Sequence, residues 1–247
     1  MNKGNLTIGI YLAGRTYHNI KLDYGDFEDW FSRELEKHGV ETRIFDVREG
    51  QYVDDEPVDG LVITGSSSSV CTEPADWVAP LLTNLQQLME RNLPMLGVCF
   101  GHQALAAAAG GVVEKHPRRR ELGTTELLLT PDGKESPLFN GLTSPFYAQE
   151  THEDVVTSIP EDCGYKVLAE NEHNRFQSVQ YSDVIYSTQF HPEISAEVMK
   201  EYIKVYANRS EEPEKVHSIL ENVRESSTGA QVMENFVNIV KGSLRNS

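Results

Sequence analysis

The sequence is poor in cysteine and has no long apolar run. Three cysteines occur, Cys71, Cys99 and Cys163, and their irregular spacing forms neither a disulfide framework nor a CxxC metal site. We therefore expect no bound metal. The longest run of small apolar residues, Ala104 to Val113, is much shorter than the ~18 residues that a membrane-spanning helix needs. We expect no membrane segment and no membrane partner.

Basic residues are also scarce. Lys and Arg total 22 against 38 Asp and Glu, which gives a net charge of −16. A field of that sign repels phosphate backbones and anionic lipid surfaces, so nucleic acid is not an expected partner. The first residues hold one lysine and a short apolar stretch that Gly9 and Gly14 interrupt, which is not the pattern of a signal peptide. We expect a cytoplasmic protein.

What the sequence does have, in its first half, is an alternation of apolar runs and helical periods. Buried strands are predicted over 6–12, 42–47, 60–64 and 95–98. Helical spacing predicts helices over 23–38 and 73–91. The alternation predicts an α/β fold, with a doubly wound and mostly parallel sheet and helices on both faces.

After Gly111 the pattern changes to short alternating stretches and then to helices. Antiparallel additions to the same sheet are predicted over 124–130, 145–149, 165–169 and 176–190, the last with a turn at 181–183. We place one domain over residues 1–205 and a C-terminal helical extension, packed on it, over residues 206–247. Whether these helices cap the sheet or form the face of a homodimer stays open.

The most informative segment lies between Pro94 and Gln103. A buried strand leads through Gly97, Cys99 and Gly101 into an alanine-rich helix, which is the cysteine form of a nucleophile elbow. The nucleophile of such a turn sits on a strained backbone, and its neighbours two positions away must be small. Both glycines meet that requirement.

The turn gives Cys99 a chemistry that the other cysteines lack. The dipole of the following helix favours the reactive thiolate, and the backbone N–H of Phe100 is placed to donate to an oxyanion. The alternative for a lone cysteine is a small buried hydrophobe. We favour that alternative for Cys71 and Cys163, but not for Cys99.

A cysteine nucleophile needs a base, and the base needs an orienting acid. Eight histidines compete for the role. His191 follows a predicted strand, and Glu193 lies two residues further on. A His-Pro-Glu tripeptide is by itself typical of a solvated loop, but the elbow in the same chain makes His191 the predicted base and Glu193 its orienting acid.

Taken together, Gly97-Val98-Cys99-Phe100-Gly101-His102-Gln103 and Gln189-Phe190-His191-Pro192-Glu193 resemble the paired motifs of the class I (triad) glutamine amidotransferases. The resemblance covers about residues 6–205 and is greatest to the glutaminase part of GMP synthase and its stand-alone relatives. Plant-type γ-glutamyl peptidases are also similar. The resemblance implies the flavodoxin-like fold of the family and a triad of Cys99 as nucleophile, His191 as acid and base, and Glu193 as its orienter.

The resemblance also implies an oxyanion hole. In the family the second donor comes from a Gly-Gly-Pro loop, which here is Gly65-Ser66-Ser67. The N–H groups of Ser66 and Phe100 are therefore the predicted donors. A plain serine-rich turn is the alternative for this loop.

Further residues are implied for substrate binding. Gln103 matches the family residue that contacts glutamine. The family's Ser-His-Gly-Asp stretch is Thr151-His152-Glu153-Asp154 here, so Thr151, His152 and Glu153 are predicted to bind substrate. Glu153 replaces a glycine, and its side chain either reshapes the pocket or accommodates a γ-glutamyl peptide.

Three functions stay open. The first is a glutaminase that hydrolyses glutamine through a cysteine thioester and supplies ammonia to a synthetase. The second is a γ-glutamyl peptidase or hydrolase that uses the same triad on another γ-substituent. The third is a non-catalytic module that binds a partner, which the retention of all three triad residues argues against.

The sequence offers no site for an acceptor reaction driven by ATP. It has no G-x-x-x-x-G-K-[ST] motif, and its serine run lacks the Gly-Gly and Asp of a pyrophosphatase-type loop. We expect no cofactor, and the synthetase must lie on another chain. The basic cluster from Lys115 to Arg120 either docks such a partner or is a solvated loop, and we favour the loop.

Overall fold

The computed structural model describes residues 6–53, 57–117, 120–208 and 213–246. Its strands are β1 (Thr7–Leu12), β2 (Glu41–Asp46), β3 (Gly60–Ile63), β4 (Met95–Val98), β5 (Val112–Lys115), β6 (Glu121–Leu129), β7 (Phe146–His152), β8 (Asp154–Ser158), β9 (Lys166–Glu170), β10 (Ser178–Gln180) and β11 (Ile185–Thr188). Its α-helices are α1 (His18–Tyr24), α2 (Phe27–Glu36), α3 (Val78–Glu90), α4 (Phe100–Ala108), α5 (Pro131–Glu135), α6 (Ala196–Ala207), α7 (Pro213–Glu221) and α8 (Thr228–Asn246).

The main sheet has nine strands in the order β2-β1-β3-β4-β11-β10-β9-β6-β7, and β5 pairs with β8 in a separate two-stranded sheet. The pairs β2·β1, β1·β3, β3·β4 and β4·β11 are parallel. The predicted α/β fold with a mostly parallel sheet is confirmed for this half. The predicted antiparallel additions are confirmed for β6, β7, β9 and β10. The strand β11 pairs antiparallel with β10 on one side and parallel with β4 on the other.

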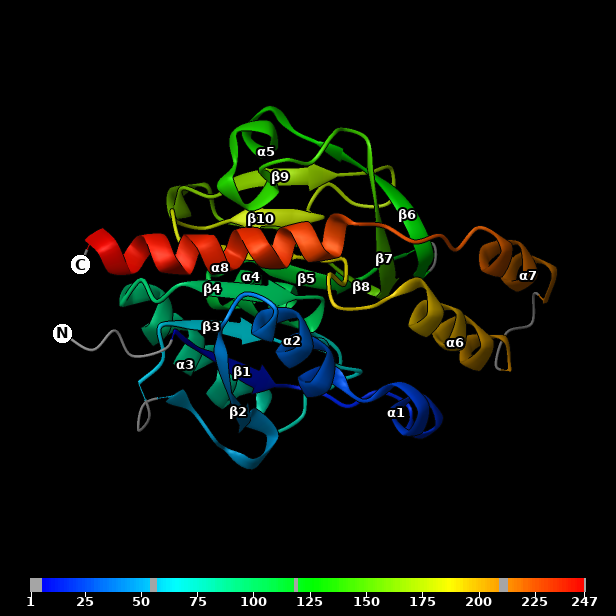
Figure 1. The fold of residues 1–247 in the computed structure, drawn as a ribbon, viewed down its shortest axis with the longest axis horizontal. Helices are drawn as coiled ribbons and strands as arrows, with labels where there is room; N and C mark the ends of the chain where they lie inside the picture. The colour runs from blue at the N-terminus through cyan, green and yellow to red at the C-terminus, as the bar shows by residue number, and fades with distance from the viewer. Residues whose placement is uncertain (1–5, 54–56, 118–119, 209–212, 247) are drawn as a thin grey trace.

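Helices cover both faces of the sheet, with α2 and α8 on one face and α3 and α4 on the other (Figure 1). The period of two along β1 explains how one strand serves two cores. Ile10 packs into a cluster with Phe236 of α8, whereas Tyr11 belongs to the opposite cluster with Leu85 of α3.

The predicted helix over 23–38 is wrong at its start. Gly25 adopts φ +86°, which ends α1, and α2 begins two residues later. Asp26 caps α2, because its carboxylate accepts from the N–H of Phe27 while its own N–H donates to Asp29. The two-stranded sheet of β5 and β8 was not expected either, since its strands are short and lie far apart in the sequence.

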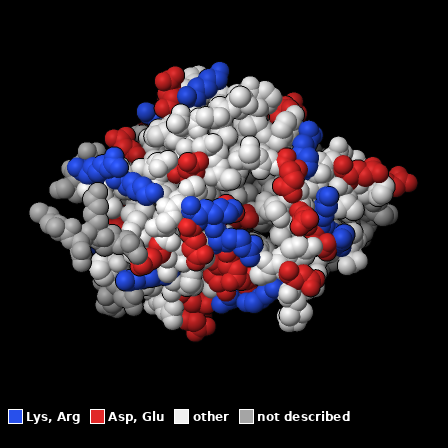
Figure 2. All heavy atoms as spheres, in the orientation of Figure 1, with Lys and Arg blue, Asp and Glu red and all other residues white. Residues whose placement is uncertain are grey.

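The surface carries both signs of charge despite the acidic balance. Figure 2 shows Lys and Arg side chains interspersed with Asp and Glu over the face in view. Across the described ranges, no helix is both long and apolar enough to cross a membrane.

The parallel strands β1, β3, β4 and β11 all end at one edge of the sheet, on the side where α1 and α6 lie in Figure 1. Loops that follow such strands meet outside their carboxyl ends, which is where α/β sheets bind ligands. Cys99, Ser66 and His191 all follow strands at this edge.

The first turn of α8 packs against the segment that follows β11. A Cβ atom at Gly229 would lie 2.1 Å from the carbonyl oxygen of Pro192, so no side chain fits there without moving backbone. At Gly242, near the other end of the same helix, a Cβ atom would have no neighbouring atom within 4 Å. The C-terminal helix therefore supports the segment that carries His191 and Glu193.

We expect Gly229→Ala to lower the free energy of unfolding by about 1–3 kcal/mol, because the added methyl group overpacks a backbone contact. Gly242→Ala is the matched control, and we expect it to raise stability by up to about 1 kcal/mol since alanine is the better helix former. Urea denaturation measures both. Equal midpoints for the two variants would contradict the packing described.

Candidate functional site

Cys99 sits on a strained turn between β4 and α4. Its backbone has φ 52° and ψ −102°, a conformation that residues other than glycine rarely adopt. A Cβ at Gly97 would lie 2.5 Å from the carbonyl oxygen of Gly101, and a Cβ at Gly101 would lie 2.4 Å from that of Ile63. Both glycines are thus required by close backbone contacts. The thiol of Cys99 lies at the N-terminal end of α4, with 5% of the residue exposed.

His191 and Glu193 form a buried pair next to this turn. The imidazole Nδ1 of His191 lies 2.7 Å from Oε1 of Glu193. The backbone N–H of His191 donates to the backbone carbonyl of Gln149. This leaves Nε2 as the nitrogen for proton transfer. Burial opposes the charged imidazole, but the Glu193 carboxylate and the Cys99 sulfur outweigh it and raise the pKa of His191 well above its usual range.

The imidazole of His191 is confined on two sides. The ring of Phe27 stacks nearly parallel to it, at an angle of 14° and a centroid distance of 6.3 Å. On another side, a Cβ at Gly65 would lie 2.9 Å from Cε1 of the imidazole. The residue after β3 must be small, because the loop passes this close to the predicted base.

Ser66, in the loop after β3, lines the same cavity as Cys99. Ser66 packs under Gly14, where a Cβ would come within 2.7 Å of the Ser66 Cα. The hydroxyl of Ser66 accepts from the N–H of Ser68, and the hydroxyl of Ser69 donates to Asp154 at 2.5 Å. Serine hydroxyls therefore hold the loop where the family has glycine and proline.

A cavity of about 420 Å³ opens beside the thiol. It brings together Cys99, the serine loop and the predicted substrate residues, namely Gln103, Thr151, His152 and Glu153. The Thr151 carbonyl oxygen lies 4.0 Å from Sγ of Cys99. The side-chain amide nitrogen of Gln103 donates to the carbonyl of Asp154 at 2.8 Å, so Gln103 also anchors the segment that bears the other three residues.

Glu153, the residue that replaces a glycine, is paired at the rim of the cavity. Its carboxylate lies 3.0 Å from Nζ of Lys115 and 3.5 Å from Nη1 of Arg120, whose Nη2 donates to the hydroxyl of Thr151. The hydrogen bond from Lys115 is the main cause that lowers the pKa of Glu153. Lys115 and Arg120 of the basic cluster thus pair with Glu153 within this cavity. Arg118 and Arg119 lie outside the described residues.

The side chain of His152 lies in a buried charged cluster. Nε2 lies 3.0 Å from Glu121 and 3.3 Å from Glu150, and Nδ1 lies 3.1 Å from the carbonyl of Asp154. Burial opposes protonation, but the two carboxylates raise the pKa of His152 to about 10. Burial also raises the pKa of Glu150 to about 7. Neither Glu121 nor Glu150 was predicted from the sequence, although residues 150 and 152 share one face of β7.

Three residues of this region could each offer one ligand atom to a metal ion. Donor atoms of Glu121, His152 and His173 lie within 4.8 Å of one another. Metal binding there would require His152 to lose the proton that the two carboxylates stabilise. In the structure His152 is ion-paired with Glu121 and Glu150, and these contacts fix the segment from Thr151 to Asp154.

Known proteins resemble this chain in sequence and in fold. A family model described as glutamine amidotransferase class-I matches residues 20–207. The GMP synthase [glutamine-hydrolyzing] of Thermosipho africanus is 31% identical over 180 residues, which are 71% of this chain and 32% of the synthase. The chain therefore spans about a third of the length of that relative.

Other relatives are similar over most of their length. Gamma-glutamyl peptidase 5 of Arabidopsis thaliana is 27% identical over 204 residues, which are 81% of this chain and 80% of the peptidase. The crystal structure of a glutamine amidotransferase from Thermotoga maritima superimposes with a TM-score of 0.75 at 18% identity, covering 96% of this chain and 99% of that chain. The latter likeness shows the fold.

His191 and Glu193 should differ in their effect on the rate of amide hydrolysis. His191→Ala removes proton transfer, so we expect kcat to fall by about 10²–10⁴. Glu193→Gln keeps a hydrogen-bond partner for the ring, so we expect a smaller loss. His217→Ala, on exposed α7, is the control. Steady-state kinetics that found Glu193→Gln slower than His191→Ala would show that the roles are reversed.

Proposed function

Because the chain belongs to the class-I glutamine amidotransferase family, we propose that it hydrolyses the side-chain amide of glutamine and supplies the ammonia to a synthetase on another chain. Members of this family, and the relatives named glutamine-hydrolyzing synthase and γ-glutamyl peptidase, are hydrolytic enzymes that act on a linear C–N bond. The observation that carries the proposal is the strained Cys99 next to the buried His191–Glu193 pair, with Cys99 and His191 lining one cavity.

The first half of the reaction forms a thioester. The Cys99 thiolate attacks the side-chain carbonyl of glutamine, and the N–H groups of Ser66 and Phe100 stabilise the oxyanion. When the C–N bond breaks, Nε2 of His191 gives its proton to the departing ammonia. Glu193 supports this step, because it holds the ring through Nδ1 and favours the charged imidazole that donates the proton.

The second half of the reaction restores the enzyme. Water attacks the γ-glutamyl thioester, and the imidazole of His191, now neutral, takes a proton from that water. The C–S bond breaks, glutamate leaves, and Cys99 returns to the thiolate facing a protonated His191. The same two N–H groups stabilise the second oxyanion.

Residues around the larger cavity would hold the amino-acid end of glutamine. Gln103, Thr151, His152 and Glu153 line it, and the His152 cluster supports the segment from behind. Lys115 and Arg120 at the rim, which now pair with Glu153, are the cations that would bind the α-carboxylate group.

We further propose how the chain is organised. Residues 206–247 extend the domain of residues 1–205, since the buried residues of α8 lie in the same core as β1 and α2. A synthetase on a separate chain is the proposed acceptor of ammonia, as the similarity to GMP synthase covers about a third of that protein. A homodimer is compatible with this arrangement. Cys71 and Cys163 are free and exposed, so the prediction that they are small buried hydrophobes is wrong. Exposed free thiols suit a reducing cytoplasm.

A second candidate function is the hydrolysis of γ-glutamyl peptides. One observation favours it: Glu153 is held by two cations at the rim of the cavity, where a glycine would leave open space. The similarity to gamma-glutamyl peptidase 5 also spans most of both chains. Both candidates use the same nucleophile, and kinetics separate them.

The variant Glu153→Gly tests the choice between these functions. For a glutaminase, removing a side chain from the amino-acid end should lower KM for glutamine by about threefold to tenfold, or roughly 0.6–1.4 kcal/mol. For a peptidase, the same change should abolish turnover of γ-glutamylcysteine. Glu201→Ala, which breaks the exposed pair with Lys204 on α6, is the control. Turnover of neither compound by the wild-type chain, alone or in cell extract, would contradict both functions.

A further inference from the structure

Two cavities meet at Cys99, and they differ in their walls. The larger one, of about 420 Å³, extends toward Gln103, Lys115 and Glu153. The smaller one, of about 180 Å³, extends toward Arg15, Thr16, Phe27, His191 and Tyr202. Both are lined by Tyr17, Ser66, Ser67, Cys99, Arg120 and Thr151. A substrate bound at the thiol can therefore reach in two directions.

The position of His191 decides which half of the substrate lies in which cavity. The leaving nitrogen must face the imidazole that protonates it. Of the two cavities, His191 lines the smaller one alone. The amino-acid end of a γ-glutamyl group then occupies the larger cavity, and the leaving group occupies the smaller.

The smaller cavity is too large for ammonia alone. A water molecule, which is close to ammonia in size, takes about 30 Å³ of liquid volume, and a cavity of about 150 Å³ in another protein binds benzene. The 180 Å³ beside His191 therefore has room for a ring. The cavity therefore also admits a leaving group larger than ammonia.

Three aromatic side chains, those of Tyr17, Phe27 and Tyr202, form one part of the wall. The rings of Tyr17 and Tyr202 pack edge to face, with centroids 5.6 Å apart, and Phe27 stacks on His191. Aromatic walls favour flat, apolar groups, with which they make stacked or edge-to-face contacts. The chemistry of the wall thus matches the space that it encloses.

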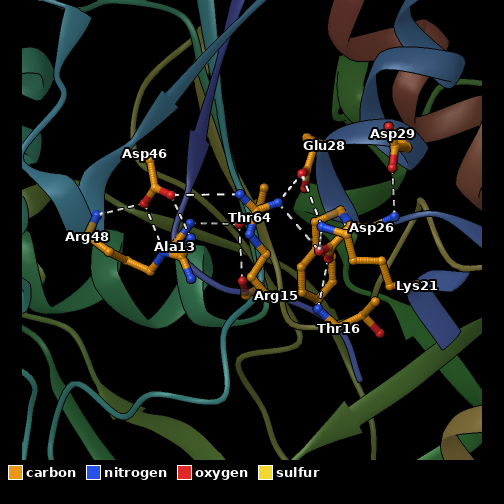
Figure 3. A network of polar contacts seen from close by, with 12 residues as sticks. Ala13, Arg15, Thr16, Lys21, Asp26, Glu28, Asp29, Asp46, Arg48 and Thr64 are labelled. Atoms are coloured by element: carbon orange, nitrogen blue, oxygen red, sulfur yellow. Dashed lines mark hydrogen bonds and ion pairs between the residues drawn. The ribbon is translucent and has the colours of Figure 1, made fainter. Parts of the chain in front are cut away.

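Polar contacts fix this wall in place. The N–H of Thr16 donates to Oδ1 of Asp26 at 2.8 Å, and the hydroxyl groups of Thr16 and Tyr202 lie 2.7 Å apart. Figure 3 shows Arg15 reaching the carboxylates of Asp26 and Glu28. The guanidinium of Arg15 is thus paired with acids, whereas Arg120, which also lines this cavity, has a buried Nε that makes no hydrogen bond to the described residues.

We propose that the smaller cavity is a leaving-group subsite for amines that carry a ring of about benzene size, and that γ-glutamyl amides of such amines are substrates. The inference rests on the proposed function, because it uses the same triad. Cys99 attacks the γ-carbonyl, the C–N bond breaks, and His191 gives its proton to the amine, which leaves neutral. Water then hydrolyses the thioester to glutamate and restores the thiol.

The first test compares three compounds on the wild-type chain: glutamine, γ-glutamylbenzylamide and γ-glutamylphenylalanine. We expect kcat/KM for the benzylamide to exceed that for glutamine by about tenfold, the upper range of an aromatic contact. The phenylalanine compound carries the same ring, so its kcat/KM should also exceed that for glutamine. Hydrolysis of glutamine without hydrolysis of the benzylamide would overturn the inference.

Variants assign the preference to the aromatic wall. Tyr17→Ala should lower the ratio of kcat/KM for the benzylamide to that for glutamine by about threefold to tenfold, since it removes one ring contact. Tyr24→Ala removes a half-buried tyrosine from the other end of α1 and should leave the ratio as in the wild type. An equal ratio in all three proteins would show that the wall does not select the leaving group.

A labelling experiment separates failure of this inference from failure of the proposed function. A diazo-ketone analogue of glutamine should label Cys99, but not Cys71 or Cys163, and Cys99→Ala should abolish labelling. In parallel, calorimetry on Cys99→Ala should show tighter binding of the benzylamide than of glutamine. Labelling at Cys99 with weaker binding of the benzylamide refutes the subsite alone, whereas labelling mainly at another cysteine refutes the triad.

Discussion

The site depends on one close contact between backbones. Gly101 at the start of α4 lies against the carbonyl oxygen of Ile63 at the end of β3, and Gly97 of β4 lies against Gly101. These contacts fix the helix, both strands and the strained Cys99 between them as one rigid unit. Because the serine loop follows β3 and the thiol follows β4, the distance between the nucleophile and the Ser66 loop is set by the packing of the sheet.

Two buried ionic groups flank that unit, and one main-chain hydrogen bond joins their strands. His191 with Glu193 follows β11, whereas His152 with Glu121 and Glu150 belongs to β7 and β6. The N–H of His191 donates to the carbonyl of Gln149, the residue before Glu150. This hydrogen bond therefore fixes the position of His191 relative to the segment that lines the larger cavity.

The sequence predicts the parts of this site that are local. The elbow can be recognised because its strand, glycines and helix are contiguous, and Glu193 lies two residues from His191. The wall of the smaller cavity could not be predicted, since Thr16 and Tyr202 are separated by 186 positions. The same applies to Glu121 and His152, which are 31 positions apart and meet only because β6 and β7 pair in that register. The break between α1 and α2 was missed because a glycine and a capping aspartate outweighed the apolar spacing.

Proton transfer in this site depends on Glu193 and Cys99, which together hold the buried imidazole of His191 in its charged form. NMR titration of the His191 ring, assigned by comparison with His191→Ala, measures this charge directly. We predict that the ring stays protonated well above pH 6.5, the pKa of an unperturbed histidine. Glu193→Gln and Cys99→Ala should each shift the titration to lower pH. A ring that titrates at or below its ordinary pH, or one that neither substitution affects, would contradict it.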